Sequence, residues 1–171
     1  MKGLAITLGV SVVAVLAVAL WTSTAAAQAN TAYGTLALGS MPSGGYNSAF
    51  GYASLNRDTA GYGNTAAGAY ALFSNTYGYE NTAVGDLALE NNTTGNFNTA
   101  IGPDALNSNT TGYENIGIGD GALGGNTSGD YNTAVGGGTL GQNTTGHVNT
   151  AIGFGAVWRL TPPATKIPPP G

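Results

Sequence analysis

The sequence lacks cysteine and has very few charged residues, and both absences narrow what the chain can be. Charged residues make up 7% of the 171 positions, against roughly 25% in an ordinary globular domain. Without cysteine no disulfide can staple the fold, so packing and backbone pairing must hold it together. Four basic residues against eight acidic ones give a net charge of −4, which argues against nucleic acid as a partner.

Groups that could carry out acid–base or metal chemistry are equally scarce. His147 is the only histidine, so no second imidazole is present to build a catalytic or metal centre. The acidic residues occupy different positions of a 17-residue repeat, and the calcium-binding glycine-rich nonapeptide is absent. Because catalysis needs convergent acid, base or nucleophile groups, we expect no catalytic residue, no metal and no cofactor. We interpret His147 and the carboxylates as solvent-exposed surface groups without a catalytic role. The acidic residues are Asp58, Glu80, Asp86, Glu90, Asp104, Glu114, Asp120 and Asp130.

The first 29 residues have the features of a secretory signal peptide. Met1 and Lys2 precede an apolar run from Leu4 to Leu20, and a small-residue stretch then allows cleavage before Gln28 or Asn30. The alternative is a retained membrane anchor, because the run approaches the roughly 20 residues that span a bilayer. We expect cleavage, so that the mature protein is secreted or held at a bacterial cell surface or outer membrane, with no membrane segment of its own.

A 17-residue repeat fills nearly all of the remaining chain. Its consensus is Asn-Thr-Ala-Ile/Val-Gly-x-x-Ala-Leu-x-x-Asn-Thr-Thr-Gly-x-x, and no insertion or deletion interrupts it. A spacing kept this strictly indicates that each unit forms one structural turn. The units begin at Asn30, Asn47, Asn64, Asn81, Asn98, Asn115, Asn132 and Asn149.

The composition of the unit predicts an all-β, parallel β-solenoid over residues 30–160. Two glycines per unit would cost a helix about 2 kcal/mol relative to alanine, which excludes a helical repeat. We expect two short strands in each unit, around Thr99–Ile101 and Ala105–Leu106 in the fifth. Eight stacked coils at about 4.8 Å would form a rod roughly 38 Å long.

The Asn-Thr-Thr-Gly quartet is typical of a turn. Asparagine side chains can bond the backbone two residues on, and glycine accepts a positive φ without a Cβ clash. The predicted turn residues are Asn92, Gly95, Asn109, Gly112, Asn143 and Gly146.

Two apolar columns are the predicted core of the rod. The fourth position of the unit supplies Val84, Ile101, Ile118, Val135 and Ile152, and the ninth supplies Leu72, Leu89, Leu106, Leu123 and Leu140. Side chains alternate along a strand, so the alanine at the third position should face outward and form a flat face. An outward apolar residue in every coil indicates a partner surface, which favours a homo-oligomer such as a trimer. The two asparagine columns are predicted to form amide ladders, each side chain donating to the next coil.

The ends of the repeat depart from the consensus. Trp158 replaces a polar residue in the last unit and is predicted to cover the open end of the stack. Residues 161–171 carry five prolines and should form an extended, disordered tail. Open β edges are templates for pairing, so end-to-end assembly into a fibre is a second mode of association.

The segments Asn81–Leu89 and Asn98–Leu106 resemble the head repeat of trimeric autotransporter (YadA-like) adhesins. They are also similar to 17-residue repeats of bacterial surface and phage tail-fibre-like proteins, and the resemblance covers residues 30 to about 157. It implies a left-handed parallel β-roll in which three copies pack around one axis, acting as a surface adhesin or fibre segment. Val84, Ile101, Val135 and Ile152 match the family's apolar core position.

Two classes of function follow from these patterns. The first is a non-catalytic adhesive or structural rod that binds an unidentified host or surface ligand, or other copies of itself. The second is ice or crystal-surface binding by a threonine ladder. We favour the first, because the threonines share their strands with residues expected to be buried. The threonine column is Thr65, Thr82, Thr99, Thr133 and Thr150, interrupted by Ile116.

Overall fold

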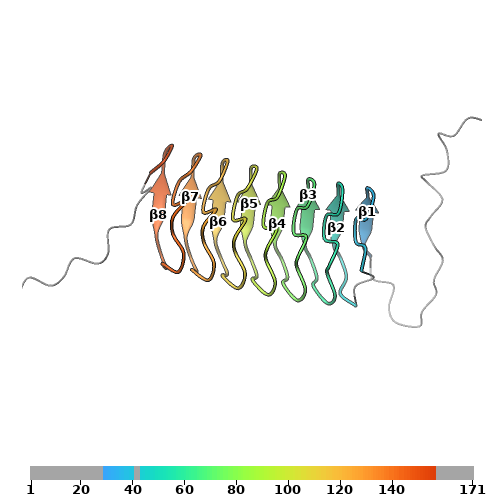
Figure 1. Cartoon of the computed structure of the whole chain (residues 1–171). Coiled ribbons are helices and arrows are strands. Elements are labelled where there is room, and N and C mark those ends of the chain that lie inside the picture. The colour runs from blue at the N-terminus through green and yellow to red at the C-terminus, as the bar shows by residue number, and fades with distance from the viewer. Residues whose placement is uncertain (1–28, 41–42, 157–171) are drawn as a thin grey trace, which may run out of the picture.

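The computed structural model describes residues 29–40 and 43–156, which form a single parallel β-solenoid (Figure 1). Each strand pairs with the next in chain order and in 17-residue register, for example Thr82 with Thr99. The predicted fold class is confirmed. The proposed signal peptide, Trp158 and the proline-rich tail lie outside the described residues, apart from Ala29. The strands are β1 (Thr31–Tyr33), β2 (Ser48–Phe50), β3 (Thr65–Ala67), β4 (Thr82–Val84), β5 (Thr99–Ile101), β6 (Ile116–Ile118), β7 (Thr133–Val135) and β8 (Thr150–Ile152).

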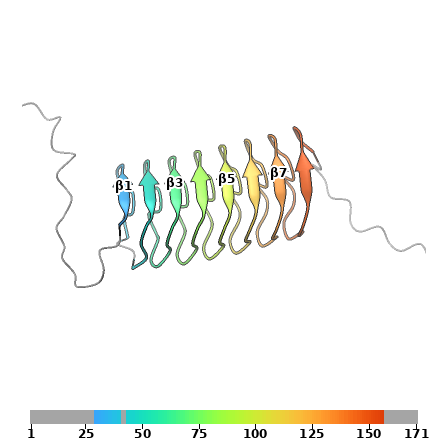
Figure 2. The same cartoon turned by 180° about the vertical axis from the view of Figure 1, so that it is seen from behind.

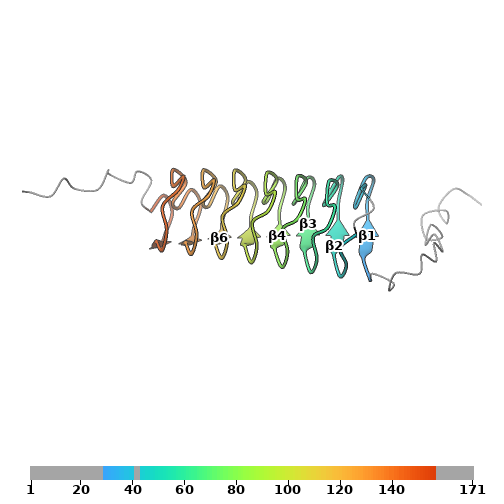
Figure 3. The ribbon, with the colours of Figure 1, turned by 90° about the horizontal axis from the view of Figure 1, so that it is seen from below.

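Each unit contributes one strand, and the second predicted strand is absent. All eight strands lie on one side of the rod, and the loops that return the chain lie on the other (Figures 2 and 3). The segment expected to pair around Ala105–Leu106 is a turn, because Leu106 has a φ of +52°. Hydrogen bonds between coils nevertheless continue there, since the Leu89 N–H donates to the Ala105 carbonyl at 3.0 Å.

The side chains that point into the core and those that point to solvent are the reverse of the prediction. From β2 to β8 the central residue is buried, as at Ala83 and Ala100, whereas Val84, Ile101 and Ile152 are 39%, 41% and 73% exposed. The expectation that the fourth position lines the core and the third faces outward is therefore wrong in the single chain. The fourth-position residues that were expected in the core are Val84, Ile101, Ile118, Val135 and Ile152.

The narrowness of the coil explains why alanine faces inward. Gly117 takes the alanine position in β6, and a Cβ placed there would lie 2.9 Å from the Ala122 carbonyl oxygen and 3.3 Å from Leu106 Cγ. Even a methyl group would be too close at this level, so the gap between the two sides of the coil holds no side chain larger than the alanine methyl of the other coils. The leucine column fills the rest of the core and is buried; it includes Leu72, Leu89, Leu106, Leu123 and Leu140.

The buried leucines adopt a backbone conformation that L-residues rarely use. Leu55 through Leu140 have φ values between +47° and +53°, a left-handed conformation that costs roughly 1–2 kcal/mol per residue. Full burial of a leucine side chain contributes about 1.5–3 kcal/mol, which is enough to offset this strain. The sharp left-handed bend lets a short coil turn its leucine inward.

The two glycines of the unit are required for different reasons. Gly102 has a φ of +129°, and a Cβ there would lie 2.7 Å from the Gly119 carbonyl carbon of the next coil. Gly95 does not have a positive φ, contrary to the prediction for this turn. A Cβ on Gly95 would instead clash with the Gly112 carbonyl oxygen and with Asn92 Oδ1. Close approach of the next coil and of the turn's own asparagine, not the turn dihedral, therefore requires glycine at Gly95 and Gly112, and the Asn143 side chain requires it at Gly146.

Replacing an exposed left-handed residue by glycine should stabilise the rod. Glu114 is exposed with a φ of +52°, and Gly63 occupies the same position three coils earlier. Relief of the left-handed strain outweighs the added freedom of the unfolded chain, so we expect Glu114→Gly to gain about 0.5–1 kcal/mol in thermal or urea denaturation. The control Asp120→Gly removes the same charge from a residue without positive φ and should lose about 0.5–1 kcal/mol; equal effects of the two variants would contradict the explanation.

Candidate interaction surfaces

The described part of the chain contains no cluster that resembles an active site. No three histidine, aspartate or glutamate side chains of these residues lie close enough together to hold a metal ion. Among the described residues, no helix has the length and apolar character that a membrane span requires. Two features of the rod are built to interact: the asparagine ladders that join its coils, and the outward face of its strands.

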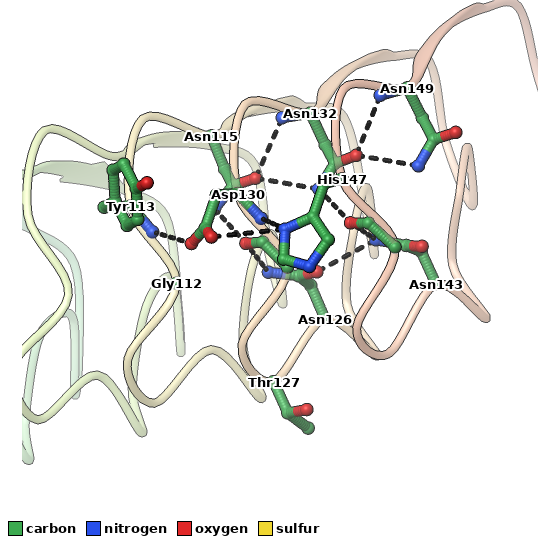
Figure 4. Close-up of polar contacts among 12 residues, drawn as sticks. Gly112, Tyr113, Asn115, Asn126, Thr127, Asp130, Asn132, Asn143, His147 and Asn149 are labelled. Carbon is green, nitrogen blue, oxygen red and sulfur yellow. Dashed lines mark hydrogen bonds and ion pairs between the residues drawn. The ribbon is translucent and has the colours of Figure 1, made fainter.

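The first asparagine column links every coil to its neighbours through buried amides. Asn98 donates from Nδ2 to Asn81 Oδ1 at 3.1 Å and to the Gly112 carbonyl at 2.8 Å, and its backbone N–H also donates to Asn81 Oδ1. Asn98 Oδ1 in turn accepts from the N–H and Nδ2 of Asn115. Figure 4 shows the same pattern from Asn115 to Asn149. The polar groups of each rung are therefore fully paired inside the rod.

The predicted turn asparagines form a second ladder and are not exposed. Asn109 Nδ2 donates to Asn92 Oδ1 at 2.9 Å and to the Gly112 carbonyl at 3.0 Å. The carbonyl lies three residues ahead, not two, and it also accepts from Asn98 of the first ladder. The amide ladders predicted from the sequence are present, but each Nδ2 donates to the preceding coil, not to the next. The turn residues Asn92, Asn109 and Asn143 are consequently buried.

The second ladder has distinct ends. At its start, Asp58 takes the asparagine position and is fully buried, so its interpretation as a solvated charge is wrong. Its Oδ1 accepts from the Gly61 N–H and Asn75 Nδ2, and its Oδ2 accepts from Asn47 Nδ2. At the other end, Asn143 Oδ1 is the one buried side-chain oxygen or nitrogen of the described residues without a hydrogen-bond partner.

Three donors surround Asp58, yet burial has the larger effect on its carboxyl group. Loss of solvent raises the pKa of Asp58 above its usual 3.8, and the bonds from Gly61 and Asn75 lower it by less. An acceptor suits this site, because the first rung has no preceding asparagine to which it could donate. Aligning the units could have identified Asp58 from the sequence, since it alone places a carboxylate in the asparagine column.

The strand face carries side chains from the second and fourth positions of each unit. Because the alanine between them faces inward, a threonine and a branched apolar residue both face outward, as do Thr99 and Ile101 in β5. Ile116 takes the threonine position in β6 and is also exposed. The face thus presents methyl and hydroxyl groups from β3 to β8, and aromatic rings at the outer position of β1 and β2. It includes the exposed side chains of Tyr33, Phe50, Val84, Ile101, Ile116 and Ile152.

His147 lies on the corner of the rod beside Asp130 (Figure 4). Its Nδ1 is 3.1 Å from the Asp130 backbone nitrogen and 3.2 Å from Asp130 Oδ2. One nitrogen cannot serve both partners: neutral, it accepts from the N–H, and protonated, it donates to the carboxylate. The side chain is 55% exposed, and no nucleophile accompanies it, so the arrangement is a surface contact between coils.

Comparison with protein-family models, curated proteins and solved structures finds no match to this chain. Inferences about its function therefore rest on its own sequence and geometry.

Breaking one ladder rung should destabilise the rod far more than removing an exposed asparagine. Asn109→Ala leaves Asn92 Oδ1 and one Asn126 amide hydrogen buried without partners. At about 1–3 kcal/mol for each unsatisfied group, we expect a loss of roughly 2–5 kcal/mol in urea denaturation. Asn91→Ala, on an exposed side chain, should lose less than about 1 kcal/mol, and comparable losses for the two variants would argue against the ladder as the main support.

Replacing Asp58 by asparagine should stabilise the protein in a pH-dependent way. Because the folded-state pKa of Asp58 is raised, the native state binds this proton more readily than the unfolded chain, and ionisation destabilises the fold as pH rises above 3.8. Asp58→Asn also restores the consensus, a change that commonly adds roughly 0.5–2 kcal/mol; it gives up the bond from Asn47 Nδ2 to Oδ2, but Asn47 keeps its bond to the Gly61 carbonyl. Thermal melts should show a higher Tm at pH 7 and a smaller gain at pH 3; a gain that grew on acidification would contradict the assignment.

Proposed function

We propose that the chain is a non-catalytic, exported rod that acts in adhesion or self-assembly at a bacterial surface or in a fibre. The observation that carries this proposal is the strand face, where branched apolar side chains face outward in successive coils from β4 and are exposed at Val84, Ile101 and Ile152. Exposed apolar surface of this extent on a rigid scaffold is typical of protein interfaces. Three further points support it: the signal-like N-terminus, the resemblance to trimeric autotransporter head repeats, and the scarcity of groups for catalysis.

The strand face is proposed as the contact between copies of the chain. Parallel packing of three such faces would bury Val84, Ile101, Ile152 and their equivalents, which the single chain leaves in water. The fourth position would then be a core position of the assembly, although it is not a core position of the single coil. The threonine methyl groups would add to the same interface.

The test is the mass of the protein in solution by light scattering across a hundredfold range of concentration. We expect an oligomer, and we expect Val84→Thr/Val135→Thr to shift its dissociation to at least tenfold higher concentration, because apolar surface is replaced by nearly isosteric hydroxyl groups. Val148→Thr changes an exposed valine outside the strands and should leave the mass unchanged. A wild-type protein that stays monomeric throughout would refute assembly through this face.

Ice or crystal-surface binding is a second candidate, favoured by one specific observation. The residues sharing strands with the threonines face outward, not inward, so the reason for setting this function aside no longer holds. Thr82 and Thr99 now stand in register beside outward Val84 and Ile101 on a parallel sheet. A thermal-hysteresis assay at micromolar concentration separates the candidates. Hysteresis that Thr99→Lys abolishes, from a monomeric wild-type protein, would replace the assembly proposal.

A further inference from the structure

A row of aromatic rings runs along the corner of the rod that precedes the strands. The last two positions of the unit supply one ring in each of the first six coils, at either the sixteenth or the seventeenth position. The rings form what we call the corner row: Tyr46, Tyr62, Tyr79, Phe97, Tyr113 and Tyr131. His147 follows in the seventh coil, so each of the first seven coils supplies a planar side chain at this corner.

The rings from Tyr62 to Phe97 are in contact with one another, as are Tyr113 and Tyr131, and the row is partly open to solvent. Tyr62 and Tyr79 stack with centroids 4.9 Å apart, whereas Phe97 meets Tyr79 edge-to-face at 5.1 Å and 82°. Tyr131 meets Tyr113 in the same way, at 5.1 Å and 75°. In an edge-to-face pair, the ring that presents its edge keeps both faces free of its partner. Phe97 and Tyr131 are 43% and 47% exposed, so aromatic surface is available to a ligand.

Carboxylates alternate with these rings along the seventeenth position. Glu80 and Glu114 occupy that position in the coils before and after Phe97, and both side chains are exposed. Phe97, Thr99, Glu114 and Ile116 line a shallow hollow of about 500 Å³ between the corner row and the strand face. The ring, carboxylate and hydroxyl groups therefore open onto one surface depression.

The charge around the corner row has one sign. Of the four lysines and arginines in the sequence, Arg57 alone falls in the described residues, and it lies 4.8 Å over the Phe73 ring in another part of the coil. The acidic side chains at the corner are Glu80, Glu114 and Asp130, and the whole chain has a net charge of −4. A polyanion would be repelled, and a cation would be attracted before contact.

We propose that the corner row binds a basic polypeptide segment, whose arginine or lysine side chains lie over the rings and between the carboxylates. Ring faces attract cations through their quadrupole, and arginine makes this contact most often. Glu80 and Glu114 supply the ion pairs on either side of Phe97. The rings and carboxylates of this site lie outside the strands, and only its hollow shares Thr99 and Ile116 with the strand face.

The experiment titrates a fluorescently labelled octa-arginine peptide with the purified protein and follows anisotropy. We expect micromolar affinity that weakens as salt rises, and no binding of octa-glutamate. Glu80→Gln/Glu114→Gln should weaken binding about tenfold. The matched control, Asp104→Asn/Asp120→Asn, removes two exposed charges from the sixth and seventh positions of neighbouring units, outside the corner row, and should change binding less than twofold.

The contribution of the ring is tested by Phe97→Leu, which keeps an apolar side chain and should weaken binding about threefold. Circular dichroism and Tm measurements on each variant establish that the fold is retained. Equal losses from both charge-removing pairs, with no effect of Phe97→Leu, would mean attraction by net charge alone and would overturn the site. Tighter binding of a neutral oligosaccharide than of the peptide, lost in Phe97→Leu, would also overturn it and assign the corner row to sugars.

Discussion

Buried asparagine amides fix the spacing between coils, and the rest of the structure depends on that spacing. An isolated buried amide would cost free energy, but in this rod each Asn98-type side chain donates to one coil and accepts from the next. Such a network is stable only when every member is paired. An insertion in any coil would leave groups in two neighbouring coils unpaired. The strict 17-residue period is therefore a requirement of the ladders.

The other unusual features of the coil follow from the same constraint. Coils held this close leave no space for a Cβ at Gly95 or Gly102. A short, narrow coil must also bend sharply, which places its buried leucines in the left-handed region. The core is consequently thin, and much of the interior is polar: apart from Ser54, Asp58 and Thr139, every buried polar side chain is an asparagine. Cohesion comes as much from hydrogen bonds between coils as from apolar burial.

A rod held together from within can use its surface for other contacts. The proposed roles share this logic, since the strand face repeats methyl and hydroxyl groups in register and the corner row repeats rings and carboxylates. Neither surface is needed to complete the hydrogen bonding of the coil. Hydrogen bonding differs at the two ends of the second ladder. Asp58 begins this ladder with an acceptor, and Asn143 leaves an acceptor unused at its other end. The corner row escaped the sequence analysis because its rings alternate between two adjacent positions and form no single column.

The sequence by itself determined the repeat, the parallel β-solenoid, the buried leucine column and the two amide ladders, because identical residues every 17 positions must stack. It could not determine which side of the strand faces inward. A strand of three residues is too short to display an alternating pattern, and both Ala100 and Ile101 are apolar. Only the tertiary structure decided between them, through the narrow gap between the strand and the opposite turn, which admits a methyl group and excludes a larger side chain. That same gap turned the isoleucines and valines outward and produced the strand face.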